Sequence, residues 1–393
     1  MNFSSVKQAF APRALGVWLF CLVAAPGALA GGLVLAPLQG LAALFLAPWR
    51  TLPRLARQGG LPLALFAAFL VWALLSALWS PERGGRTATH LLAGAGFGLL
   101  FATGLGFRAG APESRWPRVA VLAFFGLILA LGLIEVFGGM PFNRMAQPDQ
   151  PYEVLFRAPM KGVTVLTVSC WAGAGLLWRG GRAGQACAAL LLAGAGALAL
   201  ASEMDANVVA FVLGLIGLIA GFAFTGRAFA GAAFIAAAWL LASPMVLALL
   251  APAAEQLDLP ASWEQRAMIW RDAAASVAQR PLFGQGLGAF RVEAEAFHMA
   301  GAAIRPQHPH NAGMQIWFEL GGVGAALAAA ALAAFGWRAR RALAGDRTGA
   351  AAATGCLLAC AAIASLSFGL WAEWWLAALF AAAGFAACAR RPG

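Results

Sequence analysis

Twelve long apolar runs constrain the fold of this chain more than any other feature of its sequence. A helix needs about 20 apolar residues to cross a bilayer core, and only helices and closed barrels satisfy their backbone hydrogen bonds in lipid. We therefore predict an all-α, polytopic membrane protein with about 12 transmembrane helices. The runs cover residues 14–31, 33–48, 60–79, 88–107, 119–139, 161–178, 184–201, 206–225, 228–250, 312–335, 349–367 and 373–388.

The composition agrees with this prediction and excludes a soluble nucleic-acid-binding protein. Of the 393 residues, 62% are hydrophobic and 11% are charged, whereas soluble domains average about 45–50% and 25%. The net charge of +11 needs another explanation, which is topology and anionic partners at the membrane. A second apolar run follows the first at once, so we expect a membrane helix there rather than a cleaved signal peptide.

The distribution of Lys and Arg predicts the orientation of the helices. With both termini in the cytoplasm, every predicted inner loop is basic, as the positive-inside rule requires. The remaining basic residues gather in or beside predicted outer loops at 80–87, 140–160 and 251–311. Because cations on the outer side oppose the orientation signal, we expect an anionic ligand at the outer leaflet. The alternative is ordinary solvation of these loops, with the arginines paired to neighbouring carboxylates.

The outer loop 251–311 is far longer than the usual connection between helices, which is typical of a functional segment. Ser262 and Gln265 fit a capping box that opens a helix ending before Pro281. Its pattern is amphipathic and suits a helix lying on the outer surface. Arg266 lies on the apolar face, where it either snorkels toward lipid headgroups or binds phosphate through its bidentate guanidinium.

Two further motifs follow in the same loop. The glycine-rich run 281–290 has the backbone to cradle a phosphate, but we favour a tight turn between two loop helices, because no nucleotide pool exists on the outer side. His308 and His310 lack a carboxylate or Cys partner at metal-binding spacing, so no metal is expected. Each is either a satisfied loop residue or an imidazole that orients or deprotonates a hydroxyl. Asn311 is predicted to cap the next helix.

These motifs, in this order, resemble the signature of the O-antigen ligase and polymerase superfamily, which are bacterial inner-membrane enzymes with a GT-C-like fold. The resemblance is close over about residues 262–324 and loose over the rest of the chain. It rests on Arg266 and Trp270, the glycines of the 281–290 run, His308–Asn311, Gln315 and Glu319–Gly321.

The resemblance implies a glycosyltransferase that moves a glycan from undecaprenyl pyrophosphate to a hydroxyl of lipid A core, without metal or other cofactor. By resemblance Arg266 stabilises the pyrophosphate leaving group and His310 assists the acceptor. The domains expected are membrane helices in residues 1–250, a periplasmic catalytic loop at 251–311 and membrane helices in 312–393. The expected partners are the lipid-linked glycan, lipid A core or another glycan acceptor, and membrane lipids. Further substrate-binding candidates are Arg83, Arg86, Arg157, Lys161 and His308.

Three other functions stay open at this point. A polymerase would use the same donor with a lipid-linked acceptor, and a protein O-oligosaccharyltransferase would use a protein hydroxyl. A transporter is the non-enzyme alternative, although the helix centres carry almost no ionisable residues and no repeat is evident. The chain also departs from the family at Ser202–Asp205, where members often carry a Ser-Arg pair. The acidic residues of this segment, Glu203 and Asp205, either bind a sugar hydroxyl or position one of the arginines.

Overall fold

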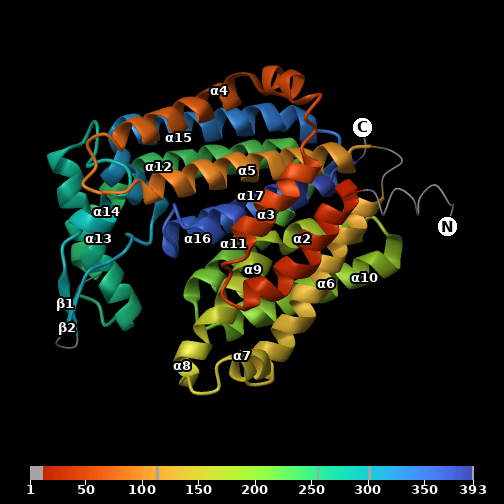
Figure 1. Cartoon of the computed structure of the whole chain (residues 1–393), viewed down its shortest axis with the longest axis horizontal. Coiled ribbons are helices and arrows are strands. Elements are labelled where there is room, and N and C mark those ends of the chain that lie inside the picture. Colours follow the sequence, from red (N-terminus) through yellow and green to blue (C-terminus); the bar gives the residue numbers. More distant parts are fainter. Residues whose placement is uncertain (1–11, 112–114, 255, 300–301, 392–393) are drawn as a thin grey trace.

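The computed structural model describes residues 12–111, 115–254, 256–299 and 302–391, most of them in helices. Figure 1 shows α4, α12 and α15 running side by side in one layer, while a second group of helices surrounds α9. The elements are α2 (Pro12–Leu29), α3 (Leu35–Leu46), α4 (Leu52–Ser76), α5 (Arg86–Ala109), α6 (Trp116–Phe137), α7 (Pro141–Ala146), α8 (Tyr152–Leu155), α9 (Arg157–Trp178), α10 (Gly181–Ala201), α11 (Asp205–Phe224), α12 (Gly226–Ala254), α13 (Ala261–Gln279), α14 (Phe290–Glu293), β1 (Phe297–Met299), β2 (Ala302–Ile304), α15 (Ala312–Leu343), α16 (Arg347–Leu366) and α17 (Glu373–Cys388).

Each of the twelve predicted apolar runs overlaps one of these helices. Within the described part of the chain, nine helices are long and apolar enough to cross a membrane. The apolar parts of α2, α3 and α17 are shorter, at 10–17 residues. The prediction of a helical, multi-pass membrane protein is confirmed, while the count of twelve spans and the GT-C-like fold stay predictions.

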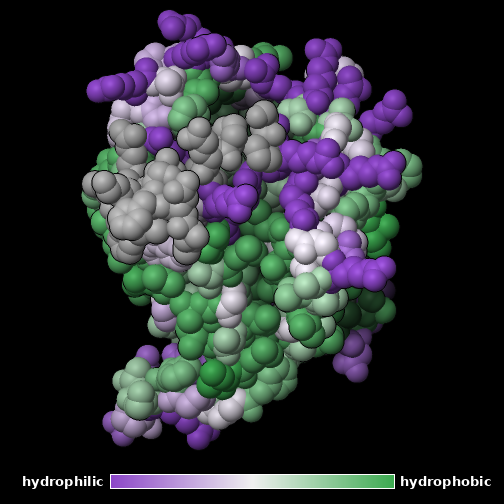
Figure 2. Space-filling model, turned by 90° about the vertical axis from the view of Figure 1, so that its right-hand side faces the viewer, coloured by the Kyte–Doolittle hydropathy of each residue, from purple (hydrophilic) through white to green (hydrophobic). Residues whose placement is uncertain are grey.

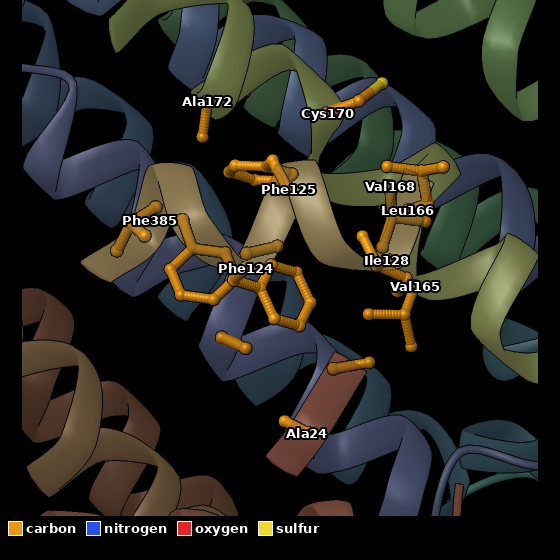
Figure 3. Close-up of a cluster of buried hydrophobic side chains, with 14 of the residues drawn as sticks. Ala24, Phe124, Phe125, Ile128, Val165, Leu166, Val168, Cys170, Ala172 and Phe385 are labelled. Atoms are coloured by element: carbon orange, nitrogen blue, oxygen red, sulfur yellow. The ribbon is translucent and has the colours of Figure 1, made fainter. Parts of the chain in front are cut away.

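The main core surrounds α9, against which α2, α6, α10, α11, α16 and α17 all pack. From Pro159 to Leu176 every residue of α9 except Lys161 is buried. Figure 3 shows part of this core, where Phe124, Phe125 and Phe385 form a cluster with ring centroids 5.1–5.5 Å apart. The burial of α9 on all sides makes it a fixed support for the residues at its N-terminal end.

The segments predicted as inner loops meet at one end of the molecule. Arg179, after α9, donates to both oxygens of Asp346 at 2.6 and 2.9 Å, and Arg118 donates to the carbonyl of Cys388 at 3.1 Å. In Figure 1, α2 begins and α17 ends on this side. Figure 2 views this side and shows hydrophilic residues gathered at its upper end, a wide apolar surface below them and a small hydrophilic tip opposite. This arrangement of two polar ends is typical of a protein that crosses a membrane.

The predicted outer loop 251–311 differs from expectation in two details. The capping box is wrong, because α13 begins at Ala261 after Pro260, and Ser262 lies inside the helix without forming a cap hydrogen bond. The second loop helix is a single turn of 4 residues, and a strand pair that was not predicted follows it. α14 ends at Glu293, and the extended backbone of the next residue, Ala294, leads into a small hairpin in which β1 and β2 pair antiparallel, with Phe297 opposite Ile304.

The apolar face of α13 packs on the protein. Ile269, Trp270, Ala273 and Val277 are buried there together with side chains of α12, α14 and α15. The amphipathic pattern of the sequence therefore marks a face that docks on neighbouring helices. Arg266 lies on the same side of α13. The docking therefore fixes its position relative to the beginning of α15.

Candidate active site

The segment His308–Asn311 is anchored on both sides just before α15 begins. The Asn311 side-chain oxygen accepts a hydrogen bond from the Met314 backbone N–H at 2.8 Å, which confirms the predicted helix cap. The amide nitrogen of the same side chain donates to the carbonyl of Ser365 at 3.1 Å. From the other side, the Trp270 indole donates to the Pro309 carbonyl at 2.8 Å. The two histidines are thus held between α13 and the end of α16.

The imidazole rings of His308 and His310 contact each other edge to face, with centroids 4.3 Å apart. His310 has a left-handed backbone with φ of 54°, a conformation that few non-glycine residues adopt and that is enriched at functional sites. The Nδ1 atom of His310 is buried and has no hydrogen-bond partner among the described residues. An unpaired buried nitrogen of this kind indicates a group kept for chemistry.

Both histidines are neutral at pH 7. Burial and, to a smaller extent, the charge of Arg266 lower the pKa of His310 from 6.5 to about 4, while the backbone of Ser367 acts in the opposite direction. Burial also lowers the pKa of His308 to about 3, with contributions from His310, Arg291 and Arg266. A neutral imidazole is able to accept a proton from a hydroxyl group.

Arg266 on α13 lies near both histidines, since its charge lowers the pKa of each. Its guanidinium donates to the carbonyls of Leu366 at 3.2 Å and Ser262 at 2.7 Å, and it lies 5.1 Å from the ring centre of Trp263. Burial lowers the pKa of Arg266 and Asp205 raises it, yet no described carboxylate forms an ion pair with it. The guanidinium charge therefore stays available for an anionic ligand.

Arg157 and Lys161, one turn apart at the N-terminal end of α9, line a cleft of about 410 Å³. Lys161 Nζ lies 5.6 Å from the ring centre of Trp374. The volume is within the range of small-ligand sites. The other lining residues are Tyr152, Glu153, Phe156, Met160, Ser202, Glu203, Met204 and Phe368.

Two chain segments connect the cleft to the histidine cluster. Phe368 lines the cleft and follows Ser367, whose backbone contacts His310. Met204 also lines the cleft and precedes Asp205, whose carboxylate accepts a hydrogen bond at 2.8 Å from the Trp263 indole beside Arg266. The structure thus brings five of the predicted site residues into one region, namely Arg157, Lys161, Arg266, His308 and His310.

The glycine-rich run forms a tight turn, as predicted. Gly284, Gly286 and Gly288 all have positive φ. The N–H of Gly286 donates to the backbone carbonyl of Glu319, and the N–H of Gly288 donates to the Glu319 carboxylate, both within 2.8 Å. These backbone donors are used inside the protein, so the turn fastens the end of α13 to α15 instead of cradling a phosphate.

Glu319 and the loop 367–372 form a polar cluster that was not predicted from the sequence, although Glu319 was part of the family resemblance. The Glu319 carboxylate is buried and also accepts hydrogen bonds from Trp371 at 2.6 Å and Gln315 at 3.1 Å. Gln315 in turn accepts from the Leu370 N–H at 2.8 Å. A carboxylate inside an apolar run was the signal available, whereas the short uncharged loop 367–372 carried none.

Arg83 and Arg86 lie beside this turn rather than beside the histidines. Both are exposed, and the nearby Glu82 carboxylate accepts hydrogen bonds from the Thr87 hydroxyl and N–H. Glu82 also lies against Gly288. No described contact joins the two arginines to Arg266 or His310, so their role in substrate binding stays a prediction.

Comparison with known proteins supplies a family for the centre of the chain. Residues 187–329 match the family model described as O-antigen ligase. Over this stretch the chain is similar to the O-antigen ligase family. The chain matches no curated protein and no solved structure. The O-antigen ligase domain contains Arg266, His308 and His310, whereas Arg83, Arg86, Arg157 and Lys161 precede it. The protein is thus a multi-pass membrane protein that is similar to the O-antigen ligase family over residues 187–329.

Proposed function

We propose that this protein moves a glycan from undecaprenyl pyrophosphate to a hydroxyl of lipid A core, at the periplasmic face of the bacterial inner membrane. The arrangement of Arg266 and His310 carries the proposal. A buried, neutral imidazole lies near a guanidinium that has no carboxylate ion-pair partner in the described chain. A cleft with two further cations lies beside them, because Phe368 lines the cleft and follows Ser367, whose backbone contacts His310. The family match over residues 187–329 supports the same reaction class.

In the proposed reaction, the bond between the sugar C1 and the pyrophosphate oxygen breaks, and a bond between C1 and the acceptor oxygen forms. His310 takes the proton from the acceptor hydroxyl. Arg266 stabilises the negative charge that develops on the pyrophosphate. Bound pyrophosphate also offsets the charge of Arg266, so it raises the pKa of His310 and makes the imidazole a stronger base when the donor is present.

The other basic residues have binding roles in this proposal. Arg157 and Lys161 hold the pyrophosphate in the cleft, and the attraction is stronger at Lys161, which is only partly exposed to water. His308 contacts the reacting groups beside His310. Arg83 and Arg86 attract anionic lipid or core phosphates at the outer leaflet, where a local excess of positive charge raises the concentration of an anionic substrate. No metal or other cofactor takes part.

The test is reconstitution of the purified protein with glycan-loaded undecaprenyl pyrophosphate, with and without lipid A core. Glycan transferred to lipid A core is the expected product, resolved by gel and mass spectrometry. A lengthening glycan on the carrier lipid would identify a polymerase instead, and transfer to an added protein would identify a protein O-oligosaccharyltransferase. No transfer to any acceptor would contradict the enzyme proposal and favour a transporter. Full activity in excess chelator is expected, and activity restored only by a cation would overturn the metal-free reaction.

A further inference from the structure

The turn between α10 and α11 separates its two carboxylates. Asp205 points to α13, because it accepts a hydrogen bond from the Trp263 indole and raises the pKa of Arg266. Glu203 lines the cleft that also holds Arg157 and Lys161. The two acidic residues therefore serve different parts of the site, although they are only two positions apart.

Glu203 is held in a strained conformation by its neighbours. Its φ of 53° lies in the left-handed region, which it shares at this site with His310. The Ser202 hydroxyl accepts hydrogen bonds from the Asn207 side chain at 3.2 Å and the Met204 N–H at 3.4 Å. Asn207 in turn accepts from the Thr164 hydroxyl at 2.9 Å. A strained non-glycine residue persists where its surroundings impose it, and such residues concentrate at ligand-binding sites.

The cleft joins three kinds of surface. Arg157 and Lys161 supply positive charge, Glu203 supplies an acceptor, and Phe156 and Phe368 supply aromatic walls. No ion pair connects Glu203 to either cation in the described contacts, so its carboxylate remains free to accept hydrogen bonds. A few polar groups set among aromatic walls are typical of a small-ligand site, in which the polar groups fix the orientation.

We propose that Glu203 binds hydroxyl groups of the sugar that is attached directly to the pyrophosphate. The inference rests on the proposed function, since it assumes a pyrophosphate-linked glycan in this cleft. With the phosphates on Arg157 and Lys161, the first sugar lies within the same cleft, and its hydroxyls donate to the carboxylate. Glu203 thereby selects a glycan-loaded carrier over the bare carrier that remains after transfer.

The test measures binding of two ligands to the purified full-length protein in nanodiscs, namely glycan-loaded and bare undecaprenyl pyrophosphate. In Glu203→Ala, the dissociation constant for the loaded carrier is expected to rise about tenfold, because a hydrogen bond to a charged acceptor is lost. Binding of the bare carrier is expected to stay equal or to tighten, because a negative charge has left a phosphate site.

Glu153→Ala is the matched control, because Glu153 lines the same cleft and carries the same charge but has an ordinary backbone. It is expected to change the binding of both carriers equally. The proposed contact between Glu203 and the sugar is wrong if Glu203→Ala keeps the wild-type ratio of the two dissociation constants. It is also wrong if Glu153→Ala loses the preference for the loaded carrier to the same extent. If the wild-type protein binds neither carrier above a plain phospholipid, the proposed function fails together with it.

Discussion

At the scale of single residues, the two histidines predict how stability depends on pH. The fold favours the neutral imidazole, since the pKa of His310 falls to about 4 and that of His308 to about 3. The stability that the neutral histidines contribute is fully present above pH 6.5. It is lost as the pH falls toward 4, because the unfolded chain binds protons that the folded chain does not. We expect the melting temperature to fall over this range, and to fall less steeply in His310→Gln. Parallel curves for the two proteins would contradict the low pKa of His310.

Substitution of Arg266 is expected to lower activity because of the position of its guanidinium and not only because of its charge. Arg266→Ala is expected to lower kcat at least about a hundredfold, as removal of one charge-stabilising group does. Arg266→Lys keeps a charge but loses the planar fork, so an intermediate loss is expected. The matched control is Arg305→Ala, because Arg305 is exposed on the same loop and its described contact is with the carbonyl of Val292.

His310→Ala belongs to the same series and is expected to abolish transfer while the protein still folds. Initial rates from the reconstituted reaction and the amount of monodisperse protein would be measured together. Full activity of Arg266→Ala or His310→Ala at a normal protein level would reject their assigned roles. A loss of activity in Arg305→Ala as large as that in Arg266→Ala would show that the position of the positive charge on this loop does not matter.

At the scale of elements, glycines decide how closely α11 and α16 approach. A Cβ built on Gly221 would lie 2.4 Å from the Cα of Ala351, and one on Gly217 would lie 2.7 Å from the carbonyl oxygen of Thr354. Small residues allow such close contacts between membrane helices. Because the obstacle at each glycine is backbone, no side-chain rotation relieves it.

Gly221→Val is therefore expected to destabilise the protein by more than about 2 kcal/mol, as overpacking a tight helix interface does. Gly231→Ala in α12 is the control, because a Cβ there meets nothing within 4 Å. Thermal unfolding in detergent would compare the two variants with the wild-type protein. An equal melting temperature for Gly221→Val would mean that α11 and α16 are farther apart than the structure has them.

The elements also show which features of the site follow from sequence. The cap of α15 was predictable because Asn311 and Met314 are neighbours in the chain. The capping box at Ser262 failed because the preceding Pro260, with its fixed φ, already sets the first turn of α13. The contact between Glu319 and Trp371 joins residues 52 positions apart, and no local periodicity carries information on such a pair.

At the scale of the whole molecule, the polar contacts separate into two ends. Arg118, Arg179 and Asp346 bind the end of α17 on one side. On the other side, His90 and Glu373 approach within 2.5 Å, and the turn after α2 lies against Lys161, as shown by Gly32. The three shorter helices therefore run between the same two ends as the longer ones. This supports twelve crossings, although α3, with 12 residues, rises only about 18 Å.

The topology of the short helices predicts a pattern of chemical labelling in cells. Leu33, after α2, and Arg50, after α3, are both exposed. If α2 and α3 each cross the membrane, Leu33→Cys reacts with a membrane-impermeant maleimide added from outside, while Arg50→Cys reacts only after the membrane is permeabilised. The background is the Cys187→Ser variant, because Cys187 is the exposed native cysteine among the described residues.

Two reference positions make this labelling decisive. Gln147→Cys, in the exposed segment after α7, is expected to react from outside, and Gly345→Cys, in the turn between α15 and α16, only from inside. If Leu33→Cys and Arg50→Cys both follow Gly345→Cys, then α2 and α3 form a re-entrant pair and the chain has ten crossings. If Gln147→Cys and Gly345→Cys exchange their behaviour, the orientation is reversed, and Arg266 and His310 would face the cytoplasm. A periplasmic transfer reaction would then be impossible at this site.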